Sequence, residues 1–379
     1  MSVIKKITKF IKKETILTVA VALAIISSFI ITPDKAYLDY IDWNTLLLLF
    51  SLMAVMAGLQ KLGLFQAVGN NLLSKVKSTR ALFLVLVFLP FFFSMFITND
   101  VALITFVPFA IIVLRIAKKE EAVVFVICLQ TIAANLGSML MPMGNPQNLY
   151  LYGKSQMSLP DFVLLMLPYS IIAALILVSI IFLKKNDTLS NINTKTNEEK
   201  SFIDNSKRNF LDGICYGILF FICLLSVAKI IEPPITAIIV SFYLIIFKRD
   251  IFKQIDYSLL VTFIGFFIFI GNMGRLDIFC NFLQKIIFNH EMPVAIMSSQ
   301  LISNVPAALL LSGFTDKWSE LITGTNLGGL GTLIASMASL ISYKHIAREY
   351  SDQRGKYIKI FTLYNIVFLV ILYALSVLI

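Results

Sequence analysis

The chain consists of long apolar runs separated by short polar segments, and most runs approach the length of a membrane crossing. A helix needs about 20 mostly apolar residues to span a bilayer. We therefore predict an all-α polytopic membrane protein. The first run follows five lysines but lacks the small-residue cleavage site of a signal peptide, so we predict a helix there. The predicted crossings are 15–31, 44–60, 121–152, 160–183, 210–229, 234–247, 255–275, 320–343 and 357–378.

Two further runs, 81–114 and 292–314, are predicted to be re-entrant hairpins. Three successive polar residues, Thr98, Asn99 and Asp100, interrupt the first run, and such residues favour caps and turns. Basic residues flank both ends, which are therefore expected in the cytoplasm. We judge this run too short for two crossings, so it should enter the membrane, turn and return. The alternative is an ordinary crossing whose polar residues face neighbouring helices.

Composition and charge agree with a membrane protein. The chain is 58% hydrophobic and 14% charged, with a mean hydropathy of +0.85, whereas soluble domains average about 25% charged residues. The net charge of +10 could indicate nucleic-acid binding, but the positive-inside rule explains it more simply. With a cytoplasmic N-terminus and an extracytoplasmic C-terminus, the threading places all but six of the 32 Lys and Arg residues in the cytoplasm. We expect the cell membrane as location and no nucleic-acid partner.

The reactive residue types give no sign of an enzyme or a metal centre. The four cysteines lie in or beside apolar segments without a C-x-x-C pair, so buried, inert thiols are expected. The two histidines, His290 and His345, are far apart. No nucleophile stands beside a plausible base, which argues against an intramembrane enzyme. We predict no cofactor, with Na⁺ considered only as a coupling ion.

An internal repeat divides the chain. Four blocks recur in the same order: 41–46 with 255–260, 61–65 with 275–279, 97–100 with 302–305, and 134–138 with 325–329. We predict an N-terminal repeat (1–183), a cytoplasmic linker with a connecting helix (184–233), and a C-terminal repeat (234–379). The extra crossing gives the repeats inverted topology. Inverted repeats with broken helices are typical of secondary transporters.

Hairpin tips from opposite faces would meet near the membrane centre, which brings Thr98, Asn99 and Asp100 close to Ser303 and Asn304. Helix N-termini favour anions, and amide, hydroxyl and free carbonyl oxygens can coordinate Na⁺. A carboxylate in such a place is stable as a charge only beside a cation or helix N-termini. Asp100 is therefore the predicted ligand of the coupling ion. The alternative role for Asp100 is an N-cap of the returning helix.

The segment 141–148 supplies a third component, because two prolines around a glycine and an asparagine break a helix. We predict that it is unwound and lines the site; the alternative is a loop at the outer membrane boundary. Its counterpart, 332–342, offers serines but no proline, so unwinding is less strongly indicated there. The predicted substrate- and ion-binding residues are Thr98, Asn99, Asp100, Asn135, Gly144, Asn145, Ser303, Asn304, Asn326 and Ser336, with Asn99, Asp100 and Asn304 as candidate Na⁺ ligands.

These motifs resemble the ion transporter superfamily, which includes citrate-transporter-like permeases, arsenical pump membrane proteins, Na⁺/H⁺ antiporters of the same fold and divalent anion/sodium symporters. The resemblance is carried by Ile-Thr-Asn-Asp-Val-Ala-Leu at 97–103, the segment 135–148, and Ser-Asn-Val-Pro-Ala at 303–307. It implies secondary active transport by alternating access. The symporter branch tends to carry Ser-Asn-Thr at both tips, so the tips here favour the arsenical-pump and citrate-permease side.

The sequence thus predicts a secondary transporter of a small anion, a citrate- or dicarboxylate-like compound or an inorganic oxyanion such as arsenite, coupled to Na⁺ or H⁺. The alternative is a Na⁺/H⁺ antiporter of the same fold, in which Asp100 binds the two ions alternately. Expected partners are the lipid bilayer, the substrate and the coupling ion. The arsenical-pump resemblance also allows a soluble ATPase subunit, and the architecture allows a homodimer.

Overall fold

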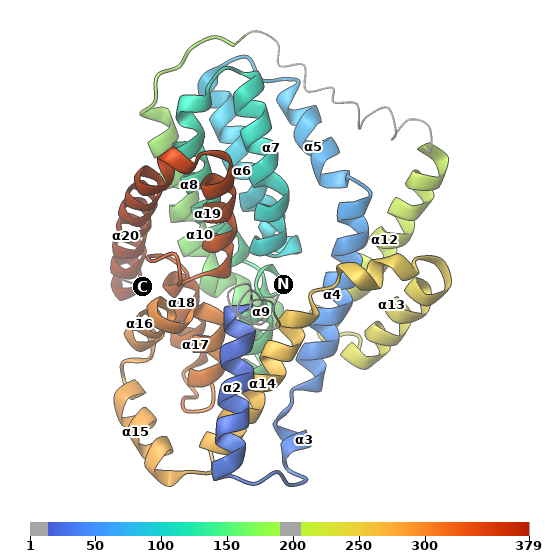
Figure 1. Cartoon of the computed structure of the whole chain (residues 1–379), viewed down its shortest axis with the longest axis vertical. Coiled ribbons are helices and arrows are strands. Elements are labelled where there is room, and N and C mark those ends of the chain that lie inside the picture. Colours follow the sequence, from blue (N-terminus) through green and yellow to red (C-terminus); the bar gives the residue numbers. More distant parts are fainter. Residues whose placement is uncertain (1–13, 190–205, 379) are drawn as a thin grey trace, which may run out of the picture.

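A computed structural model describes residues 14–189 and 206–378, and these residues form an all-helical protein (Figure 1). Seven helices are long and apolar enough to cross a membrane, or eight if the bent pair described below forms one crossing. The predicted polytopic helical class is therefore confirmed. The N-terminal lysines and most of the predicted linker lie outside the described residues.

In the first half of the chain, the helices match most of the predicted crossings to within a few residues. Its elements are α2 (Thr15–Ile30), α3 (Tyr37–Tyr40), α4 (Trp43–Lys61), α5 (Leu64–Leu73), α6 (Thr79–Ile97), α7 (Asn99–Ile116), η1 (Glu120–Ala122), α8 (Val123–Ser138), η2 (Pro142–Gly144), α9 (Pro146–Ser155) and α10 (Leu159–Phe182). Helix α12 (Ser206–Val227) leads into the second half.

The second half has a closely similar order of elements. They are α13 (Pro233–Phe247), η3 (Arg249–Gln254), α14 (Tyr257–Met273), α15 (Asp277–Ile287), α16 (Glu291–Ile302), α17 (Asn304–Leu311), α18 (Trp318–Gly328), α19 (Met337–Glu349), η4 (Ser351–Gln353) and α20 (Arg354–Leu378). Helices α6 and α7 occupy one half of the long axis, and α16 and α17 occupy the other half (Figure 1).

The turn predicted in the run 81–114 is present, because α6 ends at Ile97 and α7 begins at Asn99. The two arms have 19 and 18 residues and each passes as a candidate crossing. The premise that this run is too short for two crossings is therefore wrong, since a single residue, Thr98, makes the turn and no length is lost to a loop. That the hairpin is re-entrant stays a prediction. The second hairpin has shorter arms, of 12 and 8 residues, joined at Ser303.

A buried glutamine, Gln130, stabilises α6, the first arm of the first hairpin. Pro90 lies inside α6, and proline cannot donate to the carbonyl four residues earlier, which is that of Leu86. Gln130 of α8 donates to this oxygen at 2.7 Å and to the carbonyl of Phe106 in α7 at 3.4 Å. The side chain thus satisfies a freed backbone group and joins both arms to α8.

The base of the first hairpin is tied to the chain that follows α10. Thr79 donates its backbone N–H to the Asp187 carbonyl at 2.9 Å, while Lys119 donates to the Asp187 carboxylate at 2.7 Å. The hydrogen bond from Lys119 lowers the pKa of Asp187 below 3.8 and raises the pKa of Lys119 above 10.5. Both ends of the hairpin therefore lie beside one residue, at one end of the molecule.

Several predicted crossings are broken rather than continuous. The run 121–152 is interrupted between α8 and α9, and the run 320–343 between α18 and α19. Prolines 142 and 146 account for the first break. The second break has no proline, and four glycines between 324 and 331 lower helix propensity there instead. Helices α14 and α15 form the bent pair, with 104° between them.

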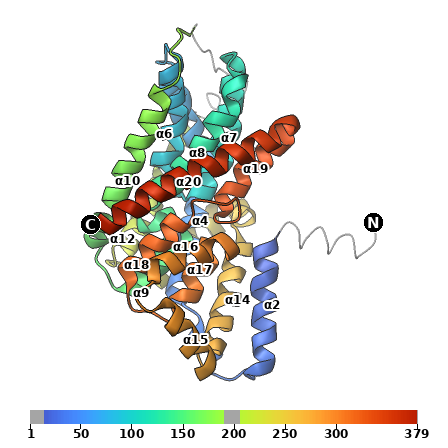
Figure 2. The ribbon, with the colours of Figure 1, turned by 90° about the vertical axis from the view of Figure 1, so that its left-hand side faces the viewer.

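The first helix of each half packs against the other half. Helix α2 of the first half packs on α14 of the second (Figure 2), and α13 packs on α4. Two ion pairs follow the same exchange, one from Lys61 to Asp250 and one from Arg275 to Asp34. Arg275 binds both carboxylate oxygens, at 2.8 and 3.2 Å, and thereby holds the pKa of Asp34 below 3.8.

Close backbone contacts recur in both halves. A Cβ on Gly137 of α8 would overlap the backbone of Phe91 in α6, and a Cβ on Gly328 of α18 would lie against Ile296 and Ser299 of α16. These two glycines occupy equivalent places in the fourth repeat block. Each one lets a hairpin arm approach the helix that carries the site asparagine of its own half.

Candidate substrate and ion site

The tip of the first hairpin joins a hydrogen-bonded group of side chains from both halves. Asn99 donates from Nδ2 to Oδ1 of Asn135 at 2.9 Å. Ser336, from the start of α19, donates to the same oxygen at 3.1 Å. All three side chains are at most 5% exposed. The structure thus brings together three of the predicted site residues, from one hairpin and two broken helices.

The tip of the second hairpin lies against the chain just before Ser336. The backbone N–H of Asn304 donates to the Ala335 carbonyl at 3.0 Å, and the Ser303 hydroxyl donates to the same oxygen at 3.4 Å. Asn135 reaches this region as well, with its Nδ2 donating to the Gly329 carbonyl at 3.4 Å. The second hairpin tip therefore contacts the break between α18 and α19 directly, and the first tip is linked to it through Asn135.

The two tips have the same local structure. Thr98 has φ 66° and ψ 149°, and Ser303 has φ 75° and ψ 155°. Each is followed directly by an asparagine that starts a helix. In an ordinary helix the first N–H groups have no partner within the helix and carry partial positive charge. The partial positive charge at the N-termini of α7 and α17 favours an anionic group, while the N–H groups of Asp100 and Asn304 already donate to Asn99 and Ala335.

A second asparagine contact joins the halves. Asn326 of α18 donates from Nδ2 to Oδ1 of Asn148 in α9 at 2.7 Å. Asn135 and Asn326 are equivalent in the repeat, and each bonds to the broken segment of the other half. Asn145, three residues before Asn148, is 2% exposed. The segment 142–150 is entirely buried inside the protein.

Gly144 has a packing role. A Cβ at this position would overlap the carbonyl oxygen of Ser138, the last residue of α8. The absence of a side chain lets η2 fold back against the end of that helix. Gly144 therefore shapes the break beside Asn145, and its steric role is independent of any ligand contact.

Several buried polar atoms around these contacts have no hydrogen-bond partner among the described residues. Buried polar groups are normally satisfied, and an unpaired one costs about 1–3 kcal/mol. A ligand or water in this region can supply the missing partners. The atoms concerned are Oδ1 of Asp100, Asn145 and Asn326, Nε2 of Gln147, Nδ2 of Asn148 and Oγ of Ser339.

Asp100 is the only acidic side chain at either tip, since Val305 takes the equivalent place in the second hairpin. Its backbone N–H donates to Oδ1 of Asn99 at 2.9 Å. No ion pair formed by the described residues includes Asp100. Its carboxylate does not cap α7 either, because no side-chain hydrogen bond caps that helix. The N-cap alternative for Asp100 therefore finds no support in this geometry.

Sequence reasoning missed some polar residues of this region. Gln147 and Asn148 belong to the predicted broken segment but were not among the predicted site residues. Gln300 of α16 was also missed; it donates to the carbonyls of Gly328 and Leu330 at 2.9 and 2.8 Å and accepts from the Thr332 N–H at 2.9 Å. The available signal was that Gln300 follows Ser298 and Ser299 as a run of polar residues in the hairpin arm.

Comparison with known proteins agrees with this architecture. A family model described as citrate transporter (CitMHS) matches residues 4–315. The chain belongs to the citrate transporter family. An uncharacterized transporter of Methanocaldococcus jannaschii is 34% identical over 83% of this chain and 84% of its own length. The inner membrane protein YbiR of Escherichia coli is 28% identical over 84% of both chains.

A shorter match links this member of the citrate transporter family to a plant protein. The silicon efflux transporter LSI3 of rice is 33% identical over 39% of this chain and 30% of its own length. Together with the candidate crossings, these matches make the protein a multi-pass membrane transporter and not an enzyme.

Proposed function

We propose that this family member is a secondary active transporter of a small anion, coupled to Na⁺ or H⁺. The observation that carries the proposal is a set of buried amide and carboxyl atoms without a hydrogen-bond partner among the described residues, at Asp100, in the segment 145–148 and at Asn326. Amide N–H groups and helix N-termini favour an anion, while the amide and carboxylate oxygens suit a cation. These groups thus offer both kinds of ligand, as coupled transport requires.

The proposed architecture is two inverted repeats, each with a re-entrant hairpin and a broken helix. Support comes from the matched backbone at Thr98 and Ser303 and from the exchange of α2 and α13 between the halves. Broken elements of inverted repeats form substrate sites near the bilayer midplane in other secondary transporters. Rocking or sliding of the hairpins relative to the rest of the protein would then expose the site alternately.

Two kinds of substrate deserve a direct test. The family is named for citrate, and the rice relative is named a silicon efflux transporter. We therefore include carboxylates and inorganic oxygen compounds. In all cases the amides of Asn99, Asn304 and Asn326 would provide hydrogen bonds, and Asp100 would bind the coupling ion.

A Na⁺/H⁺ antiporter is the second candidate. Asp100 favours it, because this carboxylate has no ion-pair partner among the described residues and one buried oxygen is unpaired. In that case the amides would complete a cation site and no anion would move.

Proteoliposomes containing the purified protein separate the two functions. Uptake of labelled citrate, dicarboxylates, sulfate, arsenite or silicic acid is measured with an inward Na⁺ gradient, an inward H⁺ gradient, or neither. Accumulation of one compound that depends on one gradient supports the anion transporter. A Na⁺-driven change of internal pH without any of these compounds would identify the antiporter, and protein-free liposomes provide the baseline.

A further inference from the structure

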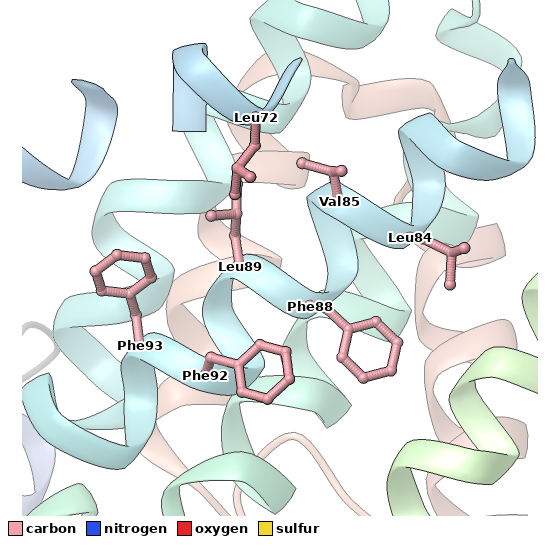
Figure 3. Close-up of a pocket in the computed structure, with 7 residues that line it drawn as sticks. All are labelled: Leu72, Leu84, Val85, Phe88, Leu89, Phe92 and Phe93. Carbon is pink, nitrogen blue, oxygen red and sulfur yellow. The ribbon is translucent and has the colours of Figure 1, made fainter. Parts of the chain in front are cut away.

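An apolar groove lies between α5 and α6, away from the candidate site, and measures about 390 Å³ (Figure 3). Leu72 comes from α5, and every other lining residue comes from successive turns of α6. Leu72 and Phe92 are exposed, at 41% and 56%, so the groove opens to the outside of the bundle. The residues of α6 that line it are Leu84, Val85, Phe88, Leu89, Phe92 and Phe93.

The groove has the shape and chemistry of a site for a hydrocarbon chain. From Leu84 to Phe93 it follows α6 for about 13 Å, at about 1.5 Å per residue. Its lining offers no polar side chain to hold water, and apolar cavities stay dry. Phe109 and Leu89 pack against Gly69 of α5 and close its inner side. Because the protein spans a membrane, lipid tails are the apolar molecules available at this surface.

Two lysines, Lys75 and Lys77, are exposed in the connection between α5 and α6. They precede the start of α6 at Thr79, and the groove begins further along that helix, at Leu84. Neither takes part in an ion pair within the described parts of the chain. Arg80, in contrast, is occupied: it donates to the Lys184 carbonyl at 2.8 Å and lies over the Phe182 ring. Free basic side chains near a membrane surface attract anionic lipid headgroups.

We propose that this groove binds one acyl chain of an anionic phospholipid, with Lys75 and Lys77 holding the phosphate. The proposal is independent of the transported substrate. The bound chain would lie along the hairpin arm that ends at Thr98 and fill the space between that arm and α5. Lipid would thereby be part of the packing that supports the hairpin.

The test uses the full-length protein in nanodiscs that contain phosphatidylglycerol with a photoreactive group in its acyl chain. Mass spectrometry locates the crosslinks by peptide. Val85→Trp fills the groove, and the control Ile171→Trp places the same side chain at an exposed position of α10. The double variant Lys75→Gln/Lys77→Gln removes the proposed phosphate ligands, and Lys356→Gln/Lys359→Gln is its matched control on α20. The lysine variants change only exposed side chains, so the test does not depend on whether Val85→Trp folds.

We expect crosslinks on the α6 peptide that exceed those on α10 several-fold. They should fall several-fold in Val85→Trp and in Lys75→Gln/Lys77→Gln and stay unchanged in both controls. A phosphatidylcholine probe of the same chain should label α6 more weakly. Equal labelling by the two lipids together with no effect of the lysine variants would overturn the proposal. So would labelling of the α6 peptide that does not exceed labelling of the α10 peptide, because the lipid chain would then not prefer the groove.

Discussion

Thr98 and Ser303, one at each hairpin tip, adopt the same uncommon backbone conformation, with φ of 66° and 75° and ψ of 149° and 155°. This region of φ and ψ is populated almost only by glycine, and other residues in it cost about 1–3 kcal/mol each. Two independent tips would be unlikely to share it by chance. This strained conformation places the next residue, Asn99 or Asn304, at the start of its helix.

Substitution by glycine tests this strain. Ser303→Gly should keep or raise the melting temperature, because relief of strain exceeds the backbone entropy cost of glycine, about 0.5–1 kcal/mol. Ser51→Gly, inside α4, is the control and should lower the melting temperature, since its backbone is helical. Thermal unfolding in detergent followed by tryptophan fluorescence gives both values. Equal losses in the two variants would contradict a strained tip.

The paired asparagines should be needed for transport more than for folding. Asn99→Ala and Asn304→Ala each remove a side chain whose loss leaves partners unsatisfied at about 1–3 kcal/mol, which corresponds to an affinity loss of about 5- to 150-fold. Asn365→Ala is the matched control, because Asn365 is also fully buried but bonds within α20. Uptake in proteoliposomes is compared at equal amounts of folded protein. Near-normal uptake by either tip variant would leave that tip with a purely structural role.

The local sequence predicted the positions of the helix breaks more accurately than the contacts between the two halves. Thr98, Pro142 and Pro146 interrupt apolar runs, so both breaks in the first half were foreseeable. Helices α5 and α15 were missed because each is short and amphipathic, with apolar residues such as Leu64, Val68 and Leu72 at helical spacing but too few of them for a crossing.

The local sequence did not predict which residues the site residues contact. Asn135 contacts Ser336, and Asn326 contacts Asn148, only because the two halves pack against each other at their breaks. The repeat indicated that Asn135 and Asn326 are equivalent, but not that each one reaches into the opposite half. The partners of Gln300 lie in its own half, at 328–332, but they come after the second hairpin, so the local sequence did not indicate them either.

Cysteine labelling should place both ends of the first hairpin on one side of the membrane. Ser78→Cys and Lys118→Cys, each in a Cys-free background, are expected to react only with reagent that reaches the cytoplasm. Contacts of Asp187 with both Thr79 and Lys119 favour this result. Labelling with a membrane-impermeant maleimide, before and after permeabilisation, measures it. Reaction of the two positions from opposite faces would refute the hairpin.

The ion pair between Lys119 and Asp187 should stabilise the protein over a defined pH range. The pKa of Asp187 is lowered, so its contribution is present above about pH 4 and is lost as the pH falls through the lowered value. The pKa of Lys119 is raised, so its contribution persists until the pH rises through that value.

Asp187→Asn tests this range. The variant should melt lower than the unchanged protein by no more than about 2 °C between about pH 5 and pH 9, because ion pairs that remain partly open to solvent contribute little. The difference should shrink toward zero in stronger acid. Asp352→Asn, at an exposed position in η4, controls for the loss of a surface carboxylate. A difference that grows as the pH falls would contradict the assignment.

Asp100 provides the most decisive prediction, because its two roles respond differently to one substitution. Asparagine caps a helix about as well as aspartate, so a capping Asp100 would tolerate Asp100→Asn. A ligand of Na⁺ or H⁺ would not, since asparagine carries no charge and does not titrate. The structure favours the second role, because the Asp100 side chain forms no capping hydrogen bond to α7 within the described parts of the chain, where one of its carboxylate oxygens is buried without a partner.

We therefore expect Asp100→Asn to separate transport from coupling. A tenfold ion gradient corresponds to about 1.4 kcal/mol per ion, so a protein that couples one ion to each substrate can accumulate its substrate up to about tenfold. The variant should equilibrate labelled substrate to a ratio of about 1 while still exchanging it across the membrane. Exchange is the internal control, since it requires a folded protein with an intact substrate site. Accumulation by Asp100→Asn with unchanged dependence on Na⁺ and pH would remove Asp100 from the coupling step, because no titratable or charged group would then be needed at the tip.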